Sequence, residues 1–449
     1  MLLQFSVSNY RCFRELQTLN LAASSQDKDL PGNCFASVAP TLEGKRWVKG
    51  AAIYGANASG KTTILNALEA LSRMVTESAK ATDPDEEISQ IEPFAFCTDS
   101  LENPTAFSII FVANAIRYEY RVAATRKRIW HESLRAFPNR LEQVWFCRDW
   151  LPADGTYSWT PERPTGFERD RQLEGYTLSN TLFLSKAIAS NREDLQPVFR
   201  WFKEHLRFMD LSARSRFGHG TTLRMLKDQG QLSERIISLL QTADLGVIDA
   251  KVIETSMPFG DLEKIAQLMG SEMQKKMRER SWPKPELTHR GPDETEWKVS
   301  WDSESAGTHR LFGLTGPWLE ILSRGSVICI DELESSLHPL LVRELLRLFF
   351  SEQDNQNGAQ ILFTTHNPIL LDPTLLRRDQ IWFTSKTSEG VANLYPLTDY
   401  SPRKGESLIK GYLAGRYGAV PIVPEGLVDD LMDRDPVANG VKESNEPSA

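Results

Sequence analysis

Hydrophobic residues alternate with polar ones in some parts of the chain and recur at helical spacing in others. The alternation predicts a strand pair within residues 1–22, and antiparallel strands over 93–96, 106–112, 118–122, 129–136 and 143–147. Helical spacing predicts helices over 62–79, 194–209, 232–241, 262–280, 311–322 and 340–350. Continuous apolar runs at 51–54, 326–330 and 360–364 are typical of buried strands, and the last two of parallel strands.

The order of these elements predicts an α/β fold with a mixed or parallel core sheet, an antiparallel β subdomain and a helical insert. We expect an N-terminal lobe over residues 1–176 and a mainly helical insert over 177–296, too short and too interrupted by glycine for a long coiled coil. A C-terminal lobe is expected over 297–424. Residues 425–449 are acidic and lack aromatic side chains, so we expect a disordered tail.

Composition narrows the class of protein. The chain has 449 residues, of which 41% are apolar and 25% charged, as in globular proteins. It has neither a long apolar run nor a secretory signal, so we expect a cytoplasmic protein that does not cross a membrane. Five scattered cysteines favour reduced thiols over a zinc or disulfide framework. The net charge of −8 gives no global attraction to nucleic acid, although it does not exclude a local basic face.

Residues Gly55–Thr62 fit the phosphate-binding pattern G-x-x-x-x-G-K-[ST], between a predicted strand and a predicted helix. Backbone N–H groups of such a loop converge on a phosphate at the positive end of the helix dipole. We expect Lys61 to reach the β- and γ-phosphates of ATP and Thr62 to bind Mg²⁺. The expected nucleotide-binding residues are Asn57, Ala58, Ser59, Gly60, Lys61, Thr62 and Thr63.

Two acidic residues, Asp331 and Glu332, directly follow the second buried strand. A carboxylate at the carboxyl end of a strand lies where α/β sheets place ligand chemistry. Asp331 suits a magnesium ligand, and Glu332 suits the group that orients or deprotonates water. The alternative is an exposed acidic turn.

A histidine and a helix start complete the candidate site. His366 follows the third buried strand and could donate a hydrogen bond to a γ-phosphate, although a lone histidine is often structural. Ser305 and Gly307 precede a predicted helix, where a hydroxyl, N–H groups and the dipole can hold an anion. The alternative for this segment is an ordinary helix cap by Ser305 or Thr308.

The order of these motifs resembles the ABC-type ATPase heads of the SMC, RecF and OLD proteins. Within that group the chain is most similar to the compact bacterial ATP-binding proteins of AAA family 15, many of which are encoded in phage-defence operons. The resemblance spans nearly the whole chain. Its further marks are the segments Asn9–Phe13, Asp331–Pro339, Arg377–Phe383 and Gly411–Ala419.

The resemblance implies that two subunits sandwich two ATP molecules, in a homodimer or a higher oligomer. Ser305 and Gly307 of one subunit would then contact the γ-phosphate held by the other. Arg11 would lie near the nucleotide, and His366 would be the switch histidine. The chain departs from transporter heads in its short Ser-Ala-Gly-Thr signature and in His338, where transporters and SMC heads usually have Asp. The sensor glutamine is not placed by the pattern; Gln90 is one candidate.

The resemblance also suggests what the nucleotide controls. OLD proteins carry a nuclease domain after the ATPase, but few residues follow His366, and the Asp433-Arg434-Asp435 motif lies in the acidic tail. We therefore expect a slow regulatory ATPase that acts as sensor, scaffold or trigger of a separate effector, a nuclease or toxin, in phage defence. The alternative is a RecF-like ATPase of DNA repair or chromosome maintenance. Nucleic acid could be bound but is not required.

Overall fold

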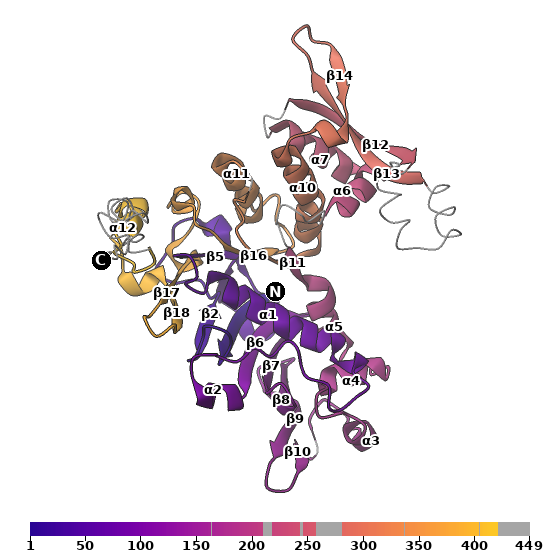
Figure 1. Cartoon of the computed structure of the whole chain (residues 1–449), viewed down its shortest axis with the longest axis vertical. Coiled ribbons are helices and arrows are strands. Elements are labelled where there is room, and N and C mark those ends of the chain that lie inside the picture. The colour runs from indigo at the N-terminus through magenta and orange to yellow at the C-terminus, as the bar shows by residue number, and fades with distance from the viewer. Residues whose placement is uncertain are drawn as a thin grey trace, which may run out of the picture.

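The computed structural model describes residues 1–162, 164–209, 218–242, 246–256, 281–335, 337–403 and 405–420. It contains a core sheet of six strands and an antiparallel sheet of seven, with helix α1 (Lys61–Glu77) in contact with strands of both (Figure 1). The predicted α/β class, with a mixed core sheet and an antiparallel β subdomain, is confirmed.

The core sheet has the strand order β11-β15-β16-β5-β17-β18 and is parallel except for its last pair. The strands are β5 (Gly50–Gly55), β11 (Leu206–Met209), β15 (Val327–Ile330), β16 (Gln360–Thr364), β17 (Ile381–Lys386) and β18 (Ala392–Pro396). Strand β5 therefore lies between two strands that come about 300 residues later in the chain.

Successive side chains of β5 point to opposite faces of the core sheet, and every residue of the strand is buried. Ala51 and Ile53 belong to a hydrophobic cluster with α1 and the antiparallel sheet, whereas Ala52 and Tyr54 belong to a second cluster on the opposite face. Helices α10 (Ala306–Arg324) and α11 (Pro339–Phe350) supply much of that second cluster. The core sheet is thus covered on both faces, as expected for a mostly parallel sheet.

The antiparallel sheet has the order β10-β9-β8-β7-β6-β1-β2. Its strands are β1 (Leu2–Ser8), β2 (Gln17–Asn20), β6 (Thr105–Ala113), β7 (Ile116–Ala124), β8 (Ile129–Phe137), β9 (Gln143–Leu151) and β10 (Thr156–Thr160). Six of the expected strands appear here, including the pair near the start of the chain. The strand expected over 93–96 is absent; there Phe94 is buried while its backbone N–H bonds to the side chain of Asn9.

A buried ion pair fastens this sheet to helix α4 (Phe183–Ala189). The Glu132 carboxylate accepts bonds from the backbone N–H groups of Phe183 (2.6 Å) and Leu184 (3.0 Å) and from the Tyr120 hydroxyl (2.9 Å). Arg148 Nη2 lies 3.5 Å from the same carboxylate, and both side chains are fully buried. Burial and the Glu132 charge raise the pKa of Tyr120 well above its ordinary value.

Residues 177–296 contain helices and strands, where the sequence predicted mainly helices. In the described part of this range the helices are α4, α5 (Gln196–Arg200), the π-helix η4 (Trp201–His205), α6 (His219–Lys227) and α7 (Gln231–Thr242). The helix expected over 194–209 ends before β11, since Leu206–Met209 pairs with β15. A three-stranded sheet, β12 (Val247–Ser256), β13 (Ser281–Arg290) and β14 (Glu296–Val299), extends from one end of the molecule (Figure 1).

The described residues also form shorter elements. They are the strand pair β3 (Cys34–Ala36) and β4 (Arg46–Val48), and the helices α2 (Thr98–Glu102), α3 (Arg171–Gly175) and α12 (Leu408–Leu413). The helix expected over 262–280 and the acidic tail over 425–449 lie outside the described residues. Within the described residues, no helix is both long and apolar enough to span a membrane.

Candidate functional site

The phosphate loop connects β5 to α1 at the carboxyl edge of the core sheet. Two of its residues, Ala58 (φ 59°) and Gly60 (φ 104°), have left-handed backbone conformations, which curl the chain into the start of the helix. A Cβ at Gly55 would lie 2.7 Å from the Thr384 carbonyl oxygen and against the hydroxyls of Thr384 and Ser59. Glycine is therefore required where the loop leaves β5 and passes β17.

Lys61 is buried beneath this loop. Its ammonium group donates to the carbonyl oxygens of Gly55 (3.0 Å) and Ala56 (2.9 Å). Burial lowers the pKa of Lys61, and the nearby carboxylates of Asp331 and Glu332 oppose that shift. The Lys61 ammonium group is thus held against the carbonyl oxygens at the start of the loop.

The hydroxyl of Thr62 meets the carboxylate of Asp331, 269 residues away in sequence. Thr62 Oγ1 lies 3.0 Å from Asp331 Oδ1 and 3.1 Å from Oδ2. On the other side, Thr364 Oγ1 donates to Asp331 Oδ1 at 2.6 Å. The two predicted magnesium ligands therefore lie together, at the junction of α1, β15 and β16.

Glu332 begins the turn after β15 and has a left-handed backbone (φ 48°). Its N–H donates to Thr364 Oγ1 at 2.8 Å, so one threonine hydroxyl holds both Asp331 and the backbone of Glu332. The Glu332 side chain is 58% exposed, and its Oε1 lies 3.6 Å from His366 Nε2. This places the predicted base and the predicted switch histidine side by side, both open to solvent.

Glu334 holds the backbone of His366 through a hydrogen bond. Its Oε1 accepts from the His366 N–H at 2.5 Å. Its Oε2 and the hydroxyl of Tyr54 are both buried and have no hydrogen-bond partner among the described residues. Burial, reinforced by the Glu334 charge, raises the pKa of Tyr54 well above its ordinary value. Glu334 acts on the position of His366, not on the exposed side of the site.

The turn at Asn9–Phe13 packs against the phosphate loop. Cys12 Sγ lies 3.1 Å from Thr63 Oγ1, and a Cβ at Gly60 would lie 3.0 Å from the same sulfur. The neighbouring Arg11 is 38% exposed and forms a two-point ion pair with Glu92, at 2.6 and 2.9 Å. Arg11 is therefore adjacent in sequence to a residue that packs on the loop, and its guanidinium is directed to Glu92.

The predicted signature forms the start of α10. Ser305 caps the helix, since its Oγ accepts from the Thr308 N–H at 3.0 Å, while Gly307 lies in the first turn. Ser305 is exposed. Among the described residues no hydrogen bond joins Ser305 or Gly307 to the phosphate loop. Similarly, His338 caps α11 through Nδ1, which accepts from the Leu340 N–H at 3.3 Å.

The donor set around Asp331 suits a magnesium ion. Thr62 and Asp331 offer a hydroxyl and a carboxylate, which are the hard oxygen ligands that Mg²⁺ takes beside substrate phosphates. The structure thus brings together Lys61, Thr62, Asp331, Glu332 and His366. The individual roles assigned to these residues, and to Asn57–Thr63, Arg11, Ser305 and Gly307, stay predictions.

Three contacts of the site were missed by sequence reasoning. Thr364 bridges Asp331 and Glu332, Thr384 binds Ser59 (Oγ to Oγ1, 2.6 Å), and Glu334 holds His366. Thr364 is the last residue of a buried strand just before His366, which is a usable signal. The Ser59–Thr384 contact depends on the pairing of β5 with β17, and the Glu334–His366 contact depends on the pairing of β15 with β16. No local pattern reveals either pairing.

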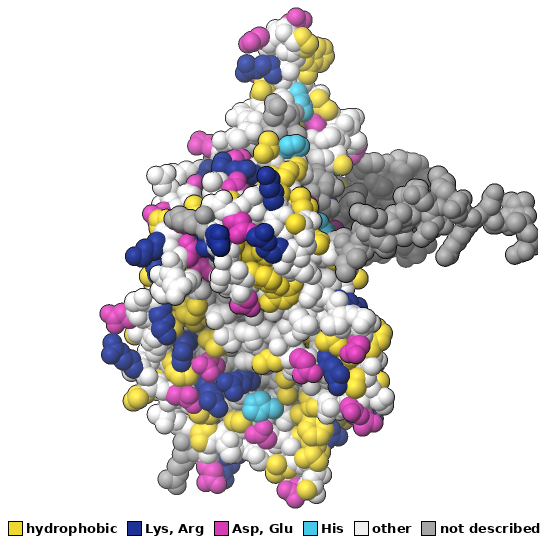
Figure 2. Space-filling view, turned by 90° about the vertical axis from the view of Figure 1, so that its left-hand side faces the viewer, with side chains coloured by type: hydrophobic (Ala, Val, Ile, Leu, Met, Phe, Trp, Pro, Cys, Tyr) yellow, Lys and Arg dark blue, Asp and Glu magenta, His cyan; other side chains and the backbone are white. Residues whose placement is uncertain are grey.

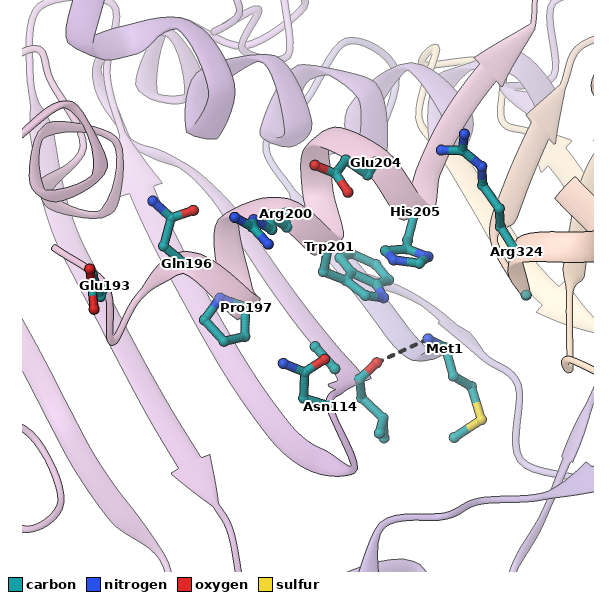
Figure 3. A pocket seen from close by; sticks show the side chains of 13 residues that line it. Met1, Asn114, Glu193, Gln196, Pro197, Arg200, Trp201, Glu204, His205 and Arg324 are labelled. Carbon is teal, nitrogen blue, oxygen red and sulfur yellow. Dashed lines mark hydrogen bonds between the residues drawn. The ribbon is translucent and has the colours of Figure 1, made fainter. Parts of the chain in front are cut away.

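A pocket of about 620 Å³ lies apart from the phosphate loop, between η4, the β6–β7 turn and the first residue (Figure 3). His205 points into it and bonds through Nδ1 to Ser326 Oγ at 3.3 Å. Burial lowers the pKa of His205, the Met1 amine and Arg324 act in the same direction, and Glu204 opposes them. This pocket shares none of its lining residues with the candidate site.

Comparison with known proteins adds a family and a distant structural likeness. The family model described as "AAA domain, putative AbiEii toxin, Type IV TA system" matches residues 51–372. That range includes the phosphate loop, Asp331, Glu332 and His366, but not Arg11. The SMC head domain from Thermotoga maritima is similar at 13% identity and a TM-score of 0.37, with 88% of this chain and 98% of that chain covered. This likeness is too distant to support a conclusion, and no curated protein matches the sequence.

Proposed function

The chain belongs to the AAA-domain family whose model matches residues 51–372, and from this we propose that it hydrolyses ATP and thereby controls a separate effector in bacterial anti-phage defence. The resemblance to ABC-type ATPase heads is confirmed at the level of an ATPase head. The narrower likeness to AAA family 15 stays a prediction, as does a cytoplasmic location.

One observation carries the proposed chemistry: Thr62 and Asp331 meet within 3.0–3.1 Å at the start of α1. The phosphate loop alone would support nucleotide binding. The Asp331 carboxylate at the same point adds the second magnesium ligand, and Glu332 follows it directly. The arrangement therefore supports hydrolysis in addition to binding.

Each residue of the site has a separate role in the proposed hydrolysis. Loop N–H groups and Lys61 hold the phosphates, and Thr62 and Asp331 would hold Mg²⁺, which neutralises charge on the β- and γ-phosphates. Glu332, exposed and on the solvent side of Asp331, orients a water and accepts its proton. His366, 3.6 Å from Glu332, donates to the γ-phosphate and restrains that carboxylate.

We further propose that a second subunit completes the site. Ser305 is exposed at the N-terminus of the 19-residue helix α10, where the helix dipole favours an anion. In a homodimer this end would contact the γ-phosphate held by the partner. ATP would then favour association because it binds tightly only to the closed dimer, and hydrolysis would reverse it.

The effector is proposed to be a separate protein, a nuclease or toxin. The description of the matched family refers to a toxin of a type IV TA system, which favours a defence role over DNA repair. In addition, basic and acidic side chains are interspersed on the face shown in Figure 2, without a continuous basic stripe on that face. DNA is therefore not needed to explain the site.

The first experiment measures ATP binding and turnover in two variants. Glu332→Gln should bind ATP normally and lose turnover, because the amide cannot accept the proton. Lys61→Ala should lose binding. Glu294→Gln is the matched control, since Glu294 is also exposed and also has a left-handed backbone (φ 58°). Turnover of Glu332→Gln equal to that of the control would refute the role of Glu332.

The second experiment measures ATP-dependent association by light scattering. Ser305→Asp keeps a good helix cap but places a negative charge where the partner's γ-phosphate would lie, so association should be lost. Ser407→Asp is the control, because Ser407 caps α12 in the same way. Normal association of Ser305→Asp would refute the shared site. Stimulation of turnover by DNA, falling with salt, would instead favour the repair function.

A further inference from the structure

A second group of metal-ligating side chains lies on the antiparallel sheet, in strands β8 and β9. His131, Cys147 and Asp149 each offer one ligand atom, and these atoms all lie within 4.8 Å of one another. His131 is directly opposite Asp149 in the β8–β9 register, and Cys147 is two residues before Asp149. Residues so spaced lie on one face of the sheet, with side chains in reach of one another.

We propose that this group, hereafter the β8–β9 cluster, binds one zinc ion through His131 Nδ1, Cys147 Sγ and an oxygen of Asp149. An imidazole nitrogen, a thiolate and a carboxylate are the three ligand types that zinc takes in proteins. Magnesium and calcium, in contrast, prefer oxygen ligands alone. Binding releases the thiol proton to solvent, because the thiolate is the ligand.

The orientation of His131 favours this assignment. Its Nδ1 faces Asp149 Oδ1 at 2.7 Å, while its Nε2 bonds to Ser133 Oγ at 2.9 Å. A metal-binding histidine commonly has its second ring nitrogen held in this way, which fixes the ring and leaves the first nitrogen for the metal. Ser133 is also the register partner of Cys147, so the support and the ligands come from the same two strands.

Distances and exposure permit entry of the ion. Cys147 Sγ lies 3.2 Å from Asp149 Oδ2, and the ligand atoms of a tetrahedral zinc site lie about 3.3–3.8 Å apart when the bonds are about 2.0–2.3 Å. Small side-chain rotations are therefore enough. His131 and Asp149 are 32% and 43% exposed, so an ion and a water in the fourth position can reach them.

The proposal departs from the expectation that cysteine spacing argues against a zinc framework, and the reason is the kind of site. Cysteine pairs mark sites built from two or more thiolates, and this cluster has only one. Its histidine and aspartate become neighbours only when β8 pairs with β9. The cluster lies on the antiparallel sheet and includes no residue of the nucleotide site, so the inference does not rest on the proposed function.

The experiment titrates the full-length, chelator-treated protein without nucleotide, using Zn²⁺ against a chromophoric chelator and then Co²⁺ with absorption spectroscopy. We expect one zinc per chain and a thiolate-to-cobalt charge-transfer band. Cys147→Ser should lose the band and Asp149→Asn should bind more weakly. Ser133→Ala should weaken binding by about 10- to 100-fold, because it releases the supporting hydrogen bond.

Two controls separate this site from others. Cys97→Ser removes another partly exposed cysteine outside the cluster, and Asp331→Asn removes the proposed magnesium ligand; both should bind zinc like the wild type. Circular dichroism of each variant checks that it is folded. Zinc affinity unchanged in folded Cys147→Ser, or a cobalt complex without the charge-transfer band, would overturn the proposal and leave the cluster as a hydrogen-bonded network.

Discussion

Replacing Thr364 with valine should disconnect the two carboxylates of the nucleotide site. Valine has nearly the same shape as threonine, so the fully buried position at the end of β16 stays filled. The hydroxyl, however, is both the donor to Asp331 Oδ1 (2.6 Å) and the acceptor of the Glu332 N–H (2.8 Å). Both bonds are lost in one substitution.

The expected cost follows from these two bonds. A hydrogen bond to a charged group contributes about 1.5–3 kcal/mol, and a buried N–H left unpaired costs about 1–3 kcal/mol. Because Glu332 is partly exposed, water can replace part of the second bond, and we expect a loss of about 2–4 kcal/mol in stability. Turnover should fall by about 100-fold if the Glu332 backbone shifts by about 1 Å.

Urea unfolding measures the first quantity, and steady-state ATP hydrolysis at saturating magnesium measures the second. Thr364→Ser is the matched control, because it keeps the hydroxyl and removes only a methyl group. The serine variant should retain most of the turnover that the valine variant loses. Wild-type turnover in Thr364→Val would refute the view that this hydroxyl positions Glu332.

Three further outcomes follow from other parts of the structure. Gly55→Ala should abolish nucleotide binding in an equilibrium binding assay, because its Cβ would meet the backbone of β17, whereas Gly175→Ala, with open space at the Cβ, should bind normally. Glu132→Gln should lower the free energy of unfolding by about 3–5 kcal/mol, since it leaves the buried Arg148 charge without its counter-ion. Arg140→Ala, at an exposed ion pair, should leave the urea midpoint unchanged. Stability should fall as pH drops below 6.5, because His205 has a lowered pKa when folded and the unfolded chain binds the proton first; His205→Gln should flatten that part of a pH series of urea midpoints, and an unchanged slope would contradict it.

The sequence was informative wherever a structure depends on neighbouring residues. The phosphate loop is such a case, because its glycines, lysine and threonine all lie within the short segment Gly55–Thr62, from the end of β5 to the start of α1. Asp331 was also recognisable, because the apolar run before it could only be a buried strand. Local pattern therefore predicted the parts of the candidate site, and the structure added how they meet.

Prediction from the sequence failed where contacts with residues distant in the chain decide the local structure. The apolar residues of 194–209 fit a helix, but Leu206–Met209 forms a strand because β15 offers a free edge. In the sequence, Thr364 looks like an ordinary strand residue. Its contact with Asp331 follows only from the pairing of β16 with β15. The β8–β9 cluster likewise needed the strand register, because His131 and Asp149 are unremarkable in sequence alone.

The position of β5 has a consequence for synthesis of the protein. Its two neighbours, β16 and β17, leave the ribosome long after the phosphate loop. At about 5–20 residues per second the delay is on the order of half a minute. During that time the hairpins β6–β9 can pair, because their contacts are local, but the loop has no strands beside it and no Asp331. Incomplete chains released early would carry the whole phosphate-binding motif but would lack both strands that flank β5, and also Asp331.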